Sequence, residues 1–257
     1  MSESKGLLKS NVVKKYWLAA TGLFLCLFLV GHLVGNLQLF ATSYEGILGF
    51  NEYAVFMTTN PAVKVLSYLT YFSILFHAID GIVIEVANRK ARPIKYAYSR
   101  PSKNSRWASR NMGILGTIIL VYVVVHMQNF WYRFHFGELP FMSSEGGDPL
   151  LKDGTIIPGG VVEQGKVVVE GVVAGPAMKD LYTIVFESFQ NPVIVFFYVI
   201  SMIALGFHLS HGFASAFQSL GLRNDKYTPL LTKSGYAFSI IVSALFALIP
   251  IYIYLIA

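Results

Sequence analysis

The sequence predicts an all-α integral membrane protein with five transmembrane helices. Of its 257 residues, 54% are hydrophobic and only 13% are charged, whereas about a quarter of the residues in soluble domains are charged. Five apolar runs are long enough to cross a bilayer, because roughly 20 helical residues span its ~30 Å hydrocarbon core. None shows the alternating pattern of an outer-membrane β-barrel. The predicted spans are about 16–40, 65–86, 111–132, 192–221 and 235–257.

The first span follows a polar, basic N-terminus of 15 residues. Its apolar run is too long for the hydrophobic region of a signal peptide, and no small-residue cleavage motif is evident, so we expect it to be retained. The single cysteine, Cys26, lies within this span. One cysteine excludes an internal disulfide, a cysteine-ligated iron–sulfur cluster and a covalently attached c-type haem.

Positive charge is unevenly distributed between the two sets of loops. Fifteen of the twenty Lys and Arg residues lie in the N-terminal arm, in 88–110 and in 222–234, whereas the two alternate loops hold five basic and ten acidic residues. The positive-inside rule therefore predicts a cytoplasmic N-terminus and an extracytoplasmic C-terminus. The basic loop 87–110 lies between two spans, so we expect it to face anionic headgroups or an acidic peripheral subunit, and we expect no nucleic-acid partner.

The long outer segment 133–191 contains β-branched pairs and Gly-rich turns at 156–173. This pattern predicts a short β-hairpin, with a disordered loop as the alternative. The fifth span is uncharged and contains Pro250, where we expect a kink. No internal repeat is evident, so the chain is expected to form a single membrane domain over residues 1–257.

Histidines recur inside four of the predicted spans. A lone histidine in a membrane is often a packing residue that hydrogen-bonds to a neighbouring helix. Ionisable residues at depth are nevertheless candidates for function, and their recurrence in four helices favours a shared role. The histidines within spans are His32, His77, His126, His208 and His211, and His135 is expected at the surface.

The number of residues between each histidine and the basic residue that flanks its span estimates its depth. His32 and His126 lie 17 and 16 residues from their flanking Lys or Arg, which corresponds to about 25 Å of helix. His77 and His211 each lie 12 residues from theirs, or about 18 Å. The first and third spans therefore share one level, and the second and fourth share another.

An up-down bundle of the first four spans places these partners diagonally across a common interior. Two facing histidines can ligate both axial positions of a haem iron, which leaves no open coordination site and suits electron transfer. The sequence therefore predicts a bundle around two b-type haems. In the fourth span the depth favours His211 as the ligand, because His208 lies 15 residues from Arg223. We expect His208 to hydrogen-bond a propionate or a neighbouring helix.

Several short motifs surround the histidines of the spans. They are Ala20-Thr-Gly-Leu-Phe-Leu, Val30-Gly-His-Leu, Phe76-His-Ala, Val125-His-Met, Leu209-Ser-His-Gly-Phe and Phe217-Gln-Ser-Leu-Gly. In their order and in the five-span layout, they resemble the single-chain dihaem cytochrome b that anchors succinate:quinone oxidoreductases, the succinate dehydrogenases and fumarate reductases. The resemblance covers all five spans.

The resemblance implies a succinate dehydrogenase subunit without dicarboxylate chemistry of its own. His32 and His126 would bind the outer haem and His77 and His211 the inner haem. Flavoprotein and iron–sulfur partners would lie on the cytoplasmic side of a bacterial cytoplasmic membrane. Electrons would pass through both haems to a quinone, with menaquinone expected, near the outer face.

Carboxylates are the expected proton donors to this quinone. Glu52 and Glu45 on the outer side are the candidates, with solvated loop residues as the alternative reading. Asp80 is the acid deep within a span, three residues after His77 and near the same helix face. Some dihaem fumarate reductases carry a glutamate where this chain has Leu209, and the 133–191 segment exceeds the usual loop of the family.

Two other functions remain open. A dihaem cytochrome b of another quinone-linked dehydrogenase would need the same four helices and histidines. A transporter that uses the histidines and Asp80 as a proton relay is the second alternative. Inverted repeats or helices broken within the membrane would favour a transporter, and the sequence shows neither.

Overall fold

The computed structural model describes residues 11–91, 103 and 105–256 and is mostly helical, at 73%. The start of the basic N-terminal arm and residues 92–102 and 104 of the basic loop lie outside these ranges. Within the described residues, five helices are long and apolar enough to cross a membrane, which confirms the five predicted spans. They cover Val12–Phe40, Pro61–Lys90, Met112–Phe136, Pro192–Ser219 and Thr228–Ile256.

The chain folds into two compact units, and all five long helices contribute residues to both. Unit 1 contains the described residues within Met1–Gly31, Ser67–Tyr122 and Ile200–Phe246. Unit 2 contains His32–Leu66, Val123–Val199 and Ala247–Ala257. Each histidine pair of interest falls within a single unit, so the two units are described separately.

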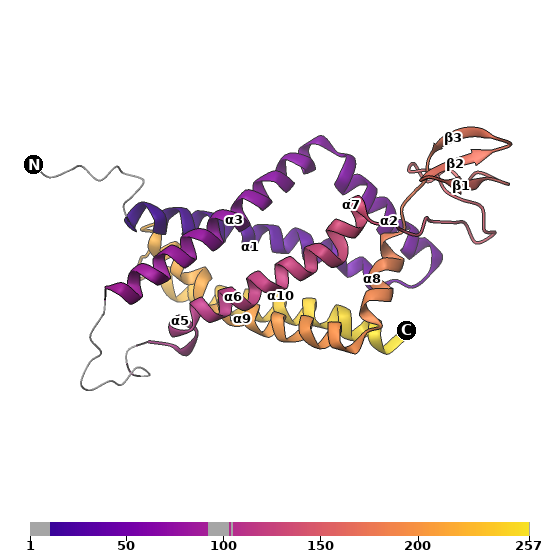
Figure 1. Cartoon of the computed structure of the whole chain (residues 1–257). Coiled ribbons are helices and arrows are strands. Elements are labelled where there is room, and N and C mark those ends of the chain that lie inside the picture. The colour runs from indigo at the N-terminus through magenta and orange to yellow at the C-terminus, as the bar shows by residue number, and fades with distance from the viewer. Residues whose placement is uncertain (1–10, 92–102, 104, 257) are drawn as a thin grey trace, which may run out of the picture. The chain divides into compact units, whose positions relative to one another are not determined.

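Unit 1 is built from parts of the long helices together with one short helix, α5 (Figure 1). A buried cluster of Ala108, Leu115 and Ala204 joins α5 to two long helices. Helices α9 and α10 approach closely, because a Cβ at Gly206 would lie 3.2 Å from Ser243 Oγ. The helices are α1 (Asn11–Asn36), α3 (Pro61–Lys90), α5 (Trp107–Arg110), α6 (Met112–His126), α9 (Pro192–Ser219) and α10 (Thr228–Ile256).

Unit 2 contains two short helices between the long ones, α2 and α8, and three short elements that extend long helices, η2, η3 and α7. The Ser43 side chain caps α2 by accepting a hydrogen bond from Gly46 N. A π-helical turn directly follows the last residue of α6, His126. The short elements are η2 (Leu37–Phe40), α2 (Tyr44–Thr59), η3 (Met127–Tyr132), α7 (Arg133–Phe136) and α8 (Leu181–Phe189).

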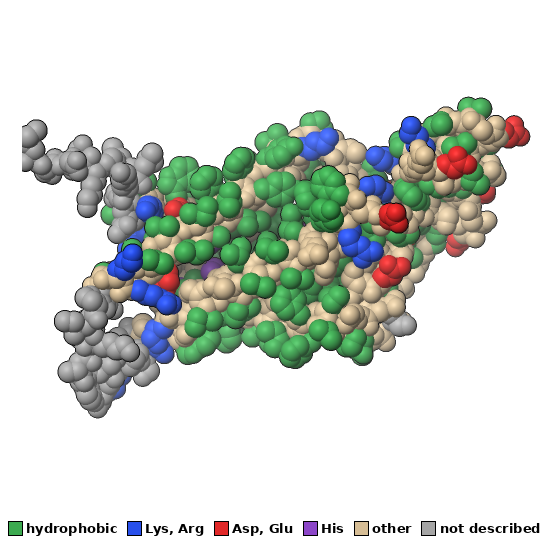
Figure 2. Space-filling model, in the orientation of Figure 1, with side chains coloured by type: hydrophobic (Ala, Val, Ile, Leu, Met, Phe, Trp, Pro, Cys, Tyr) green, Lys and Arg blue, Asp and Glu red, His purple; other side chains and the backbone are tan. Residues whose placement is uncertain are grey.

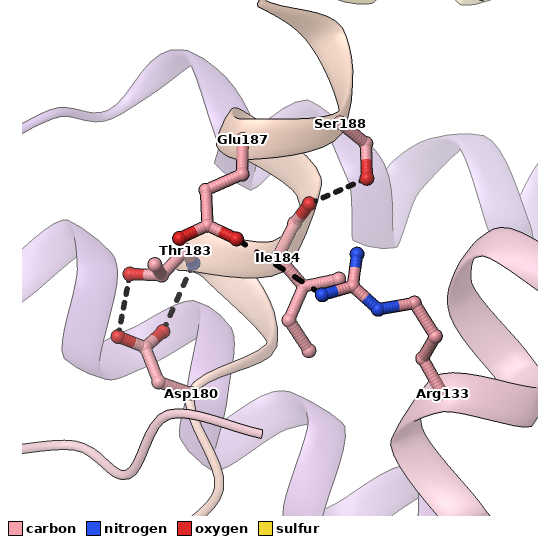
Figure 3. Close-up of polar contacts among 6 residues, drawn as sticks. All are labelled: Arg133, Asp180, Thr183, Ile184, Glu187 and Ser188. Carbon is pink, nitrogen blue, oxygen red and sulfur yellow. Dashed lines mark hydrogen bonds and ion pairs between the residues drawn. The ribbon is translucent and has the colours of Figure 1, made fainter. Parts of the chain in front are cut away.

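A buried polar cluster fixes α8 to α2 in unit 2. The fully buried Asn51 amide donates to Asp180 Oδ1 at 2.9 Å, and its oxygen accepts from the first two N–H groups of α8. Asp180 caps α8 by accepting from Thr183 N at 3.0 Å and from Thr183 Oγ1 at 2.7 Å (Figure 3). Each buried polar group of this cluster is therefore paired, as burial requires.

The segment predicted to form an outer loop is folded. Three antiparallel strands, β1 (Val161–Glu163), β2 (Lys166–Val169) and β3 (Val172–Pro176), form a sheet in the order β1-β2-β3. Both turns have positive φ at their two central residues, as type I′ hairpin turns do. Figure 1 shows this small sheet at one end of the segment. A buried cluster of Met142, Leu150 and Met178 packs against α2. This segment therefore has a core of its own within unit 2.

The long helices differ in how much of their surface the protein covers. The most apolar windows of α3 and of Met112–Phe136 are 6% buried, whereas those of α9 and α10 are 33% buried. Tyr68, Phe72 and Leu75 on α3 are each more than half exposed. Apolar helices with this much uncovered surface suit a multi-pass membrane protein, because lipid tails solvate such side chains.

Candidate functional site

Two pairs of facing histidines are the candidate site. In unit 2, the rings of His32 on α1 and His126 at the end of α6 lie edge to face, with centroids 5.8 Å apart and planes at 87°. In unit 1, the rings of His77 on α3 and His208 on α9 lie edge to face at 6.2 Å and 67°. Each pair thus joins two helices that are distant in the sequence.

Each pair brings two imidazoles close enough that both could bind one metal ion, because a metal–nitrogen bond is about 2 Å long. A haem iron needs only two protein ligands, because the porphyrin supplies the others. The described residues contain no group of three or more His, Cys, Asp or Glu side chains that would hold a bare metal ion. Each pair would supply the two protein ligands that a haem needs.

Thr21 on α1 sets the hydrogen bonding of His77. The Thr21 hydroxyl donates to Trp17 O at 2.7 Å, and His77 Nδ1 lies 3.3 Å from the same hydroxyl oxygen. Because the hydroxyl proton is already used, the Thr21 oxygen is best placed to accept from a protonated Nδ1. That tautomer leaves Nε2 of His77 unprotonated and able to bind a metal.

The close approach of α1 and α3 at this point depends on Gly22. A Cβ at residue 22 would lie 3.0 Å from Cε1 of His77, which is tighter than ordinary van der Waals contact. Glycine therefore lets the imidazole pack against the α1 backbone. Thr21 and Gly22 together fix the position of His77 in unit 1.

His208 has an unsatisfied buried nitrogen. Its Nδ1 is buried and has no hydrogen-bond partner among the described residues. Such a group is costly in a folded protein and is often explained by a missing partner at a functional site. His211, the predicted ligand of the inner haem, instead lines a cavity with Arg106, Ser210 and Tyr236. The structure thus places His208, rather than His211, opposite His77.

Aromatic and amide groups surround the pair in unit 2. The Tyr198 hydroxyl lies 3.5 Å from Nδ1 of His126 and accepts from Asn129 Nδ2 at 3.4 Å. Asn36 donates to the His32 carbonyl at 2.7 Å, and its amide lies 3.4 Å from Nδ1 of His32. The π-helix that begins after His126 carries Asn129, and π-helical turns are common at functional sites.

The remaining predicted residues lie apart from the ring pairs. Glu45 and Glu52 are both exposed on α2, and a Cβ at Gly154 would lie 3.0 Å from Glu52 Oε1. Asp80 is partly exposed on α3, three residues after His77. His135 is exposed and stacks on Trp131 at 4.6 Å.

Sequence reasoning did not identify Thr21, Asn129 or Tyr198 as site residues. Tyr198 lies in an uncharged apolar run, where a phenol hydroxyl needs a polar partner. That requirement was the available signal for Tyr198. Thr21 gave a weaker one, because a membrane threonine commonly bonds to its own helix, as it also does here.

Comparison of the chain with known proteins identifies no family. No family model, no curated protein and no solved structure matches the chain.

Proposed function

We propose that this protein is the membrane-anchor cytochrome b of a succinate:quinone oxidoreductase. It would hold two b-type haems and carry electrons from an iron–sulfur subunit to a membrane quinone. The observation that carries the proposal is the presence of two facing histidine pairs, at 5.8 and 6.2 Å, on four different apolar helices. The resemblance of the motifs around these histidines supports the choice of complex.

The proposed role of the histidines is to hold and orient the two haems. His32 and His126 would bind one haem in unit 2, and His77 with a histidine of α9 would bind the other in unit 1. Haem iron supplies one-electron transfer, and two protein ligands leave no coordination site for O₂. Thr21 and Tyr198 would orient His77 and His126 through Nδ1.

On α9 the geometry favours His208 over His211 as the ligand. His208 faces His77 and has an unsatisfied Nδ1, whereas His211 lines a cavity with Arg106 and Ser210. The ligand role of His211, which depth counting from Arg223 favours, stays an alternative. Substitution of each histidine separates the two assignments.

Quinone reduction would take place beside the haem of unit 2. His32 and His126 lie 17 and 16 residues from the basic residues that flank their spans, whereas His77 lies 12 residues from its own. If those flanks are cytoplasmic, the haem of His32 and His126 would be farther from the iron–sulfur partner and would be the exit for electrons. Reduction of a quinone consumes two electrons and two protons, and oxidation of succinate to fumarate supplies the two electrons. Glu52 is the favoured proton donor and Glu45 the second candidate, and both are exposed on α2. Menaquinone is the expected acceptor.

The partners would be a flavoprotein and an iron–sulfur subunit on the cytoplasmic side of a bacterial cytoplasmic membrane. The described ends of α3, α5 and the α9–α10 turn carry Arg89, Lys90, Arg106, Arg110 and Arg223. This charge supports a cytoplasmic orientation and would suit an acidic partner surface. The N-terminus would then be cytoplasmic and the C-terminus extracytoplasmic.

Purification in mild detergent tests the proposal. We expect a reduced-minus-oxidised spectrum of b-type haem, two non-covalent haems per chain by pyridine haemochrome assay, and co-purifying flavoprotein and iron–sulfur subunits. Haem content near zero, or haem that resists acid–acetone extraction, would exclude this function. Two haems with the subunits of another dehydrogenase would favour the cytochrome b of that enzyme.

A further inference from the structure

Two adjoining cavities lie in unit 1 where α5, α9 and α10 meet. Their volumes are about 210 and 310 Å³, and both are lined by Arg106, Ser210 and His211. The smaller one is also lined by aromatic rings, including Trp107 and Tyr236. The larger one is lined by Arg223, Gln218 and six Ser and Thr side chains. The histidine pair of unit 1 does not account for these polar side chains.

The lining of the cavities is cationic. Arg106 and Arg223 both contribute, and no Asp or Glu is among the described residues that line either cavity. Arg106 is held in place, because its guanidinium donates to the Tyr236 hydroxyl and lies 5.3 Å from the centre of that ring. A guanidinium has five N–H donors and remains charged, so Arg106 keeps donors for a ligand. The cavities therefore suit an anion.

The edge of the cavities is apolar and exposed. Trp107 is 54% exposed and Phe207 is 47% exposed at the smaller cavity, and Leu222 is 58% exposed at the larger one. Phe207 lies on the membrane helix α9, whereas Trp107 lies in the short helix α5 and Leu222 in the α9–α10 turn. At the membrane surface such side chains would contact acyl chains, and Trp is enriched at the level of the headgroups. Arg106 and Arg223 are exposed beside these apolar side chains, so the surface combines positive charge with apolar contact area. This combination matches an amphiphile with an anionic head.

Basic side chains also cluster around this part of the molecule. Figure 2 shows Lys and Arg gathered near the part of unit 1 that contains α5. Basic pockets between membrane helices on the cytoplasmic side bind anionic headgroups, and the cytoplasmic leaflet is rich in anionic lipid. The position and the lining of the cavities thus indicate the same ligand class.

We propose that these cavities bind the phosphodiester headgroup of an anionic phospholipid, with Arg106 and Arg223 as its principal ligands. The Arg106 fork would bind two phosphate oxygens, as guanidinium groups commonly do. Trp107 and Leu222 would contact the acyl chains. This site is independent of the proposed haem function, because none of its evidence depends on a haem.

Lipid binding to the purified, delipidated full chain tests the proposal. Native mass spectrometry and titration with phosphatidylglycerol or phosphatidylcholine in mixed micelles give the affinity and the number of bound lipids. We expect one tightly held phosphatidylglycerol per chain, and Arg106→Gln should weaken it about tenfold or more, as loss of a charge-assisted bidentate contact does. Arg223→Gln should weaken it less, and Arg106→Lys should restore part of the affinity.

Lys233→Gln is the matched control, because Lys233 is exposed on the same part of α10 and does not line either cavity. It should change the affinity by less than about twofold, as expected for an exposed charge. Equal binding of phosphatidylcholine and phosphatidylglycerol, or unchanged binding in Arg106→Gln, would overturn the proposal. Inorganic phosphate that binds as tightly as the lipid would identify a free-anion site instead.

Haem content measured on the same samples separates this proposal from the proposed function. Loss of haem in Arg106→Gln with unchanged phosphatidylglycerol binding would assign the cavities to haem propionates and overturn the lipid site. A chain that binds no haem but still loses phosphatidylglycerol in Arg106→Gln would keep the lipid site and exclude the cytochrome.

Discussion

The two histidine pairs have similar ring spacing and different surroundings. In unit 1, His77 contacts a threonine hydroxyl whose proton is already donated to the backbone, and Nδ1 of His208 has no described hydrogen-bond partner. In unit 2, an amide lies near His32 and a phenol lies near His126, at the longer distances of 3.4 and 3.5 Å. Spacing determines whether a pair can share an iron, whereas the groups at Nδ1 determine how basic each ligand is.

The largest expected effect is the loss of one haem from one unit alone. His32→Ala and His126→Ala should each reduce the haem content from two per chain to one and remove the same spectral component, because they share a site. His77→Ala should remove the other component. Pyridine haemochrome assays and low-temperature difference spectra measure both quantities. His135→Ala is the control and should retain both haems, because His135 is exposed.

Substitutions on α9 distinguish the two candidate ligands of unit 1. His208→Ala should remove the same component as His77→Ala, because His208 faces His77 at 6.2 Å. His211→Ala should keep both haems, since His211 lines the neighbouring cavity. The same spectra measure the outcome. The reverse pattern would restore His211 as the ligand and show that the apparent pairing of His77 with His208 does not persist when haem binds.

The third effect concerns the two candidate proton donors, Glu52 and Glu45, which both lie on α2 in unit 2. Glu52→Gln keeps the size of the side chain and removes its acid–base function, so a true proton donor should lose about a hundredfold in quinone turnover. Both haems should still be reduced by succinate in the assembled complex. Glu45→Gln is the matched comparison on the same helix. Wild-type turnover in both variants would show that neither carboxylate is an essential donor.

The five spans could be predicted because a helix that crosses a bilayer needs about 20 apolar residues with few charges. Such a run is visible in a single sequence. The folded core of the 133–191 segment could not, because Met142, Leu150 and Met178 are far apart and gather only through tertiary packing. The polar cluster of Asn51 and Asp180 is equally non-local. Such contacts leave no periodic signal in the sequence.

The depth of His208 and His211 depends on where α9 ends. A count from Arg223 gives the depth only if all the residues between the histidine and Arg223 are helical. The structure ends α9 at Ser219, and Gly221 has a positive φ of 75°, so the residues beyond Ser219 do not rise along the helix axis. By contrast, α3 continues through Arg89 to Lys90. Once α9 is measured from its own end, His208 lies nearer to the level of His77 than the count suggested.

The smallest expected effect directly tests the difference between the two Nδ1 environments. Thr21→Val keeps the shape of the side chain and removes the hydroxyl acceptor of His77, while the Leu18 carbonyl remains as a backbone partner of the ring. An imidazole without that acceptor is a weaker base and stabilises oxidised iron less, so the midpoint potential of its haem should rise. A typical net hydrogen-bond energy corresponds to about 20–60 mV for a one-electron couple. Thr21→Ser should keep the wild-type potential.

Tyr198→Phe is the corresponding change in unit 2, and it should shift the other haem by less than about 20 mV because a 3.5 Å contact is weak. Spectroelectrochemical titration of each variant resolves the two potentials. A larger shift in Tyr198→Phe than in Thr21→Val would mean that the phenol, rather than the threonine, controls ligand basicity. The unit 2 pair would then be the more strongly tuned of the two, even though its hydrogen-bond distances are the longer ones.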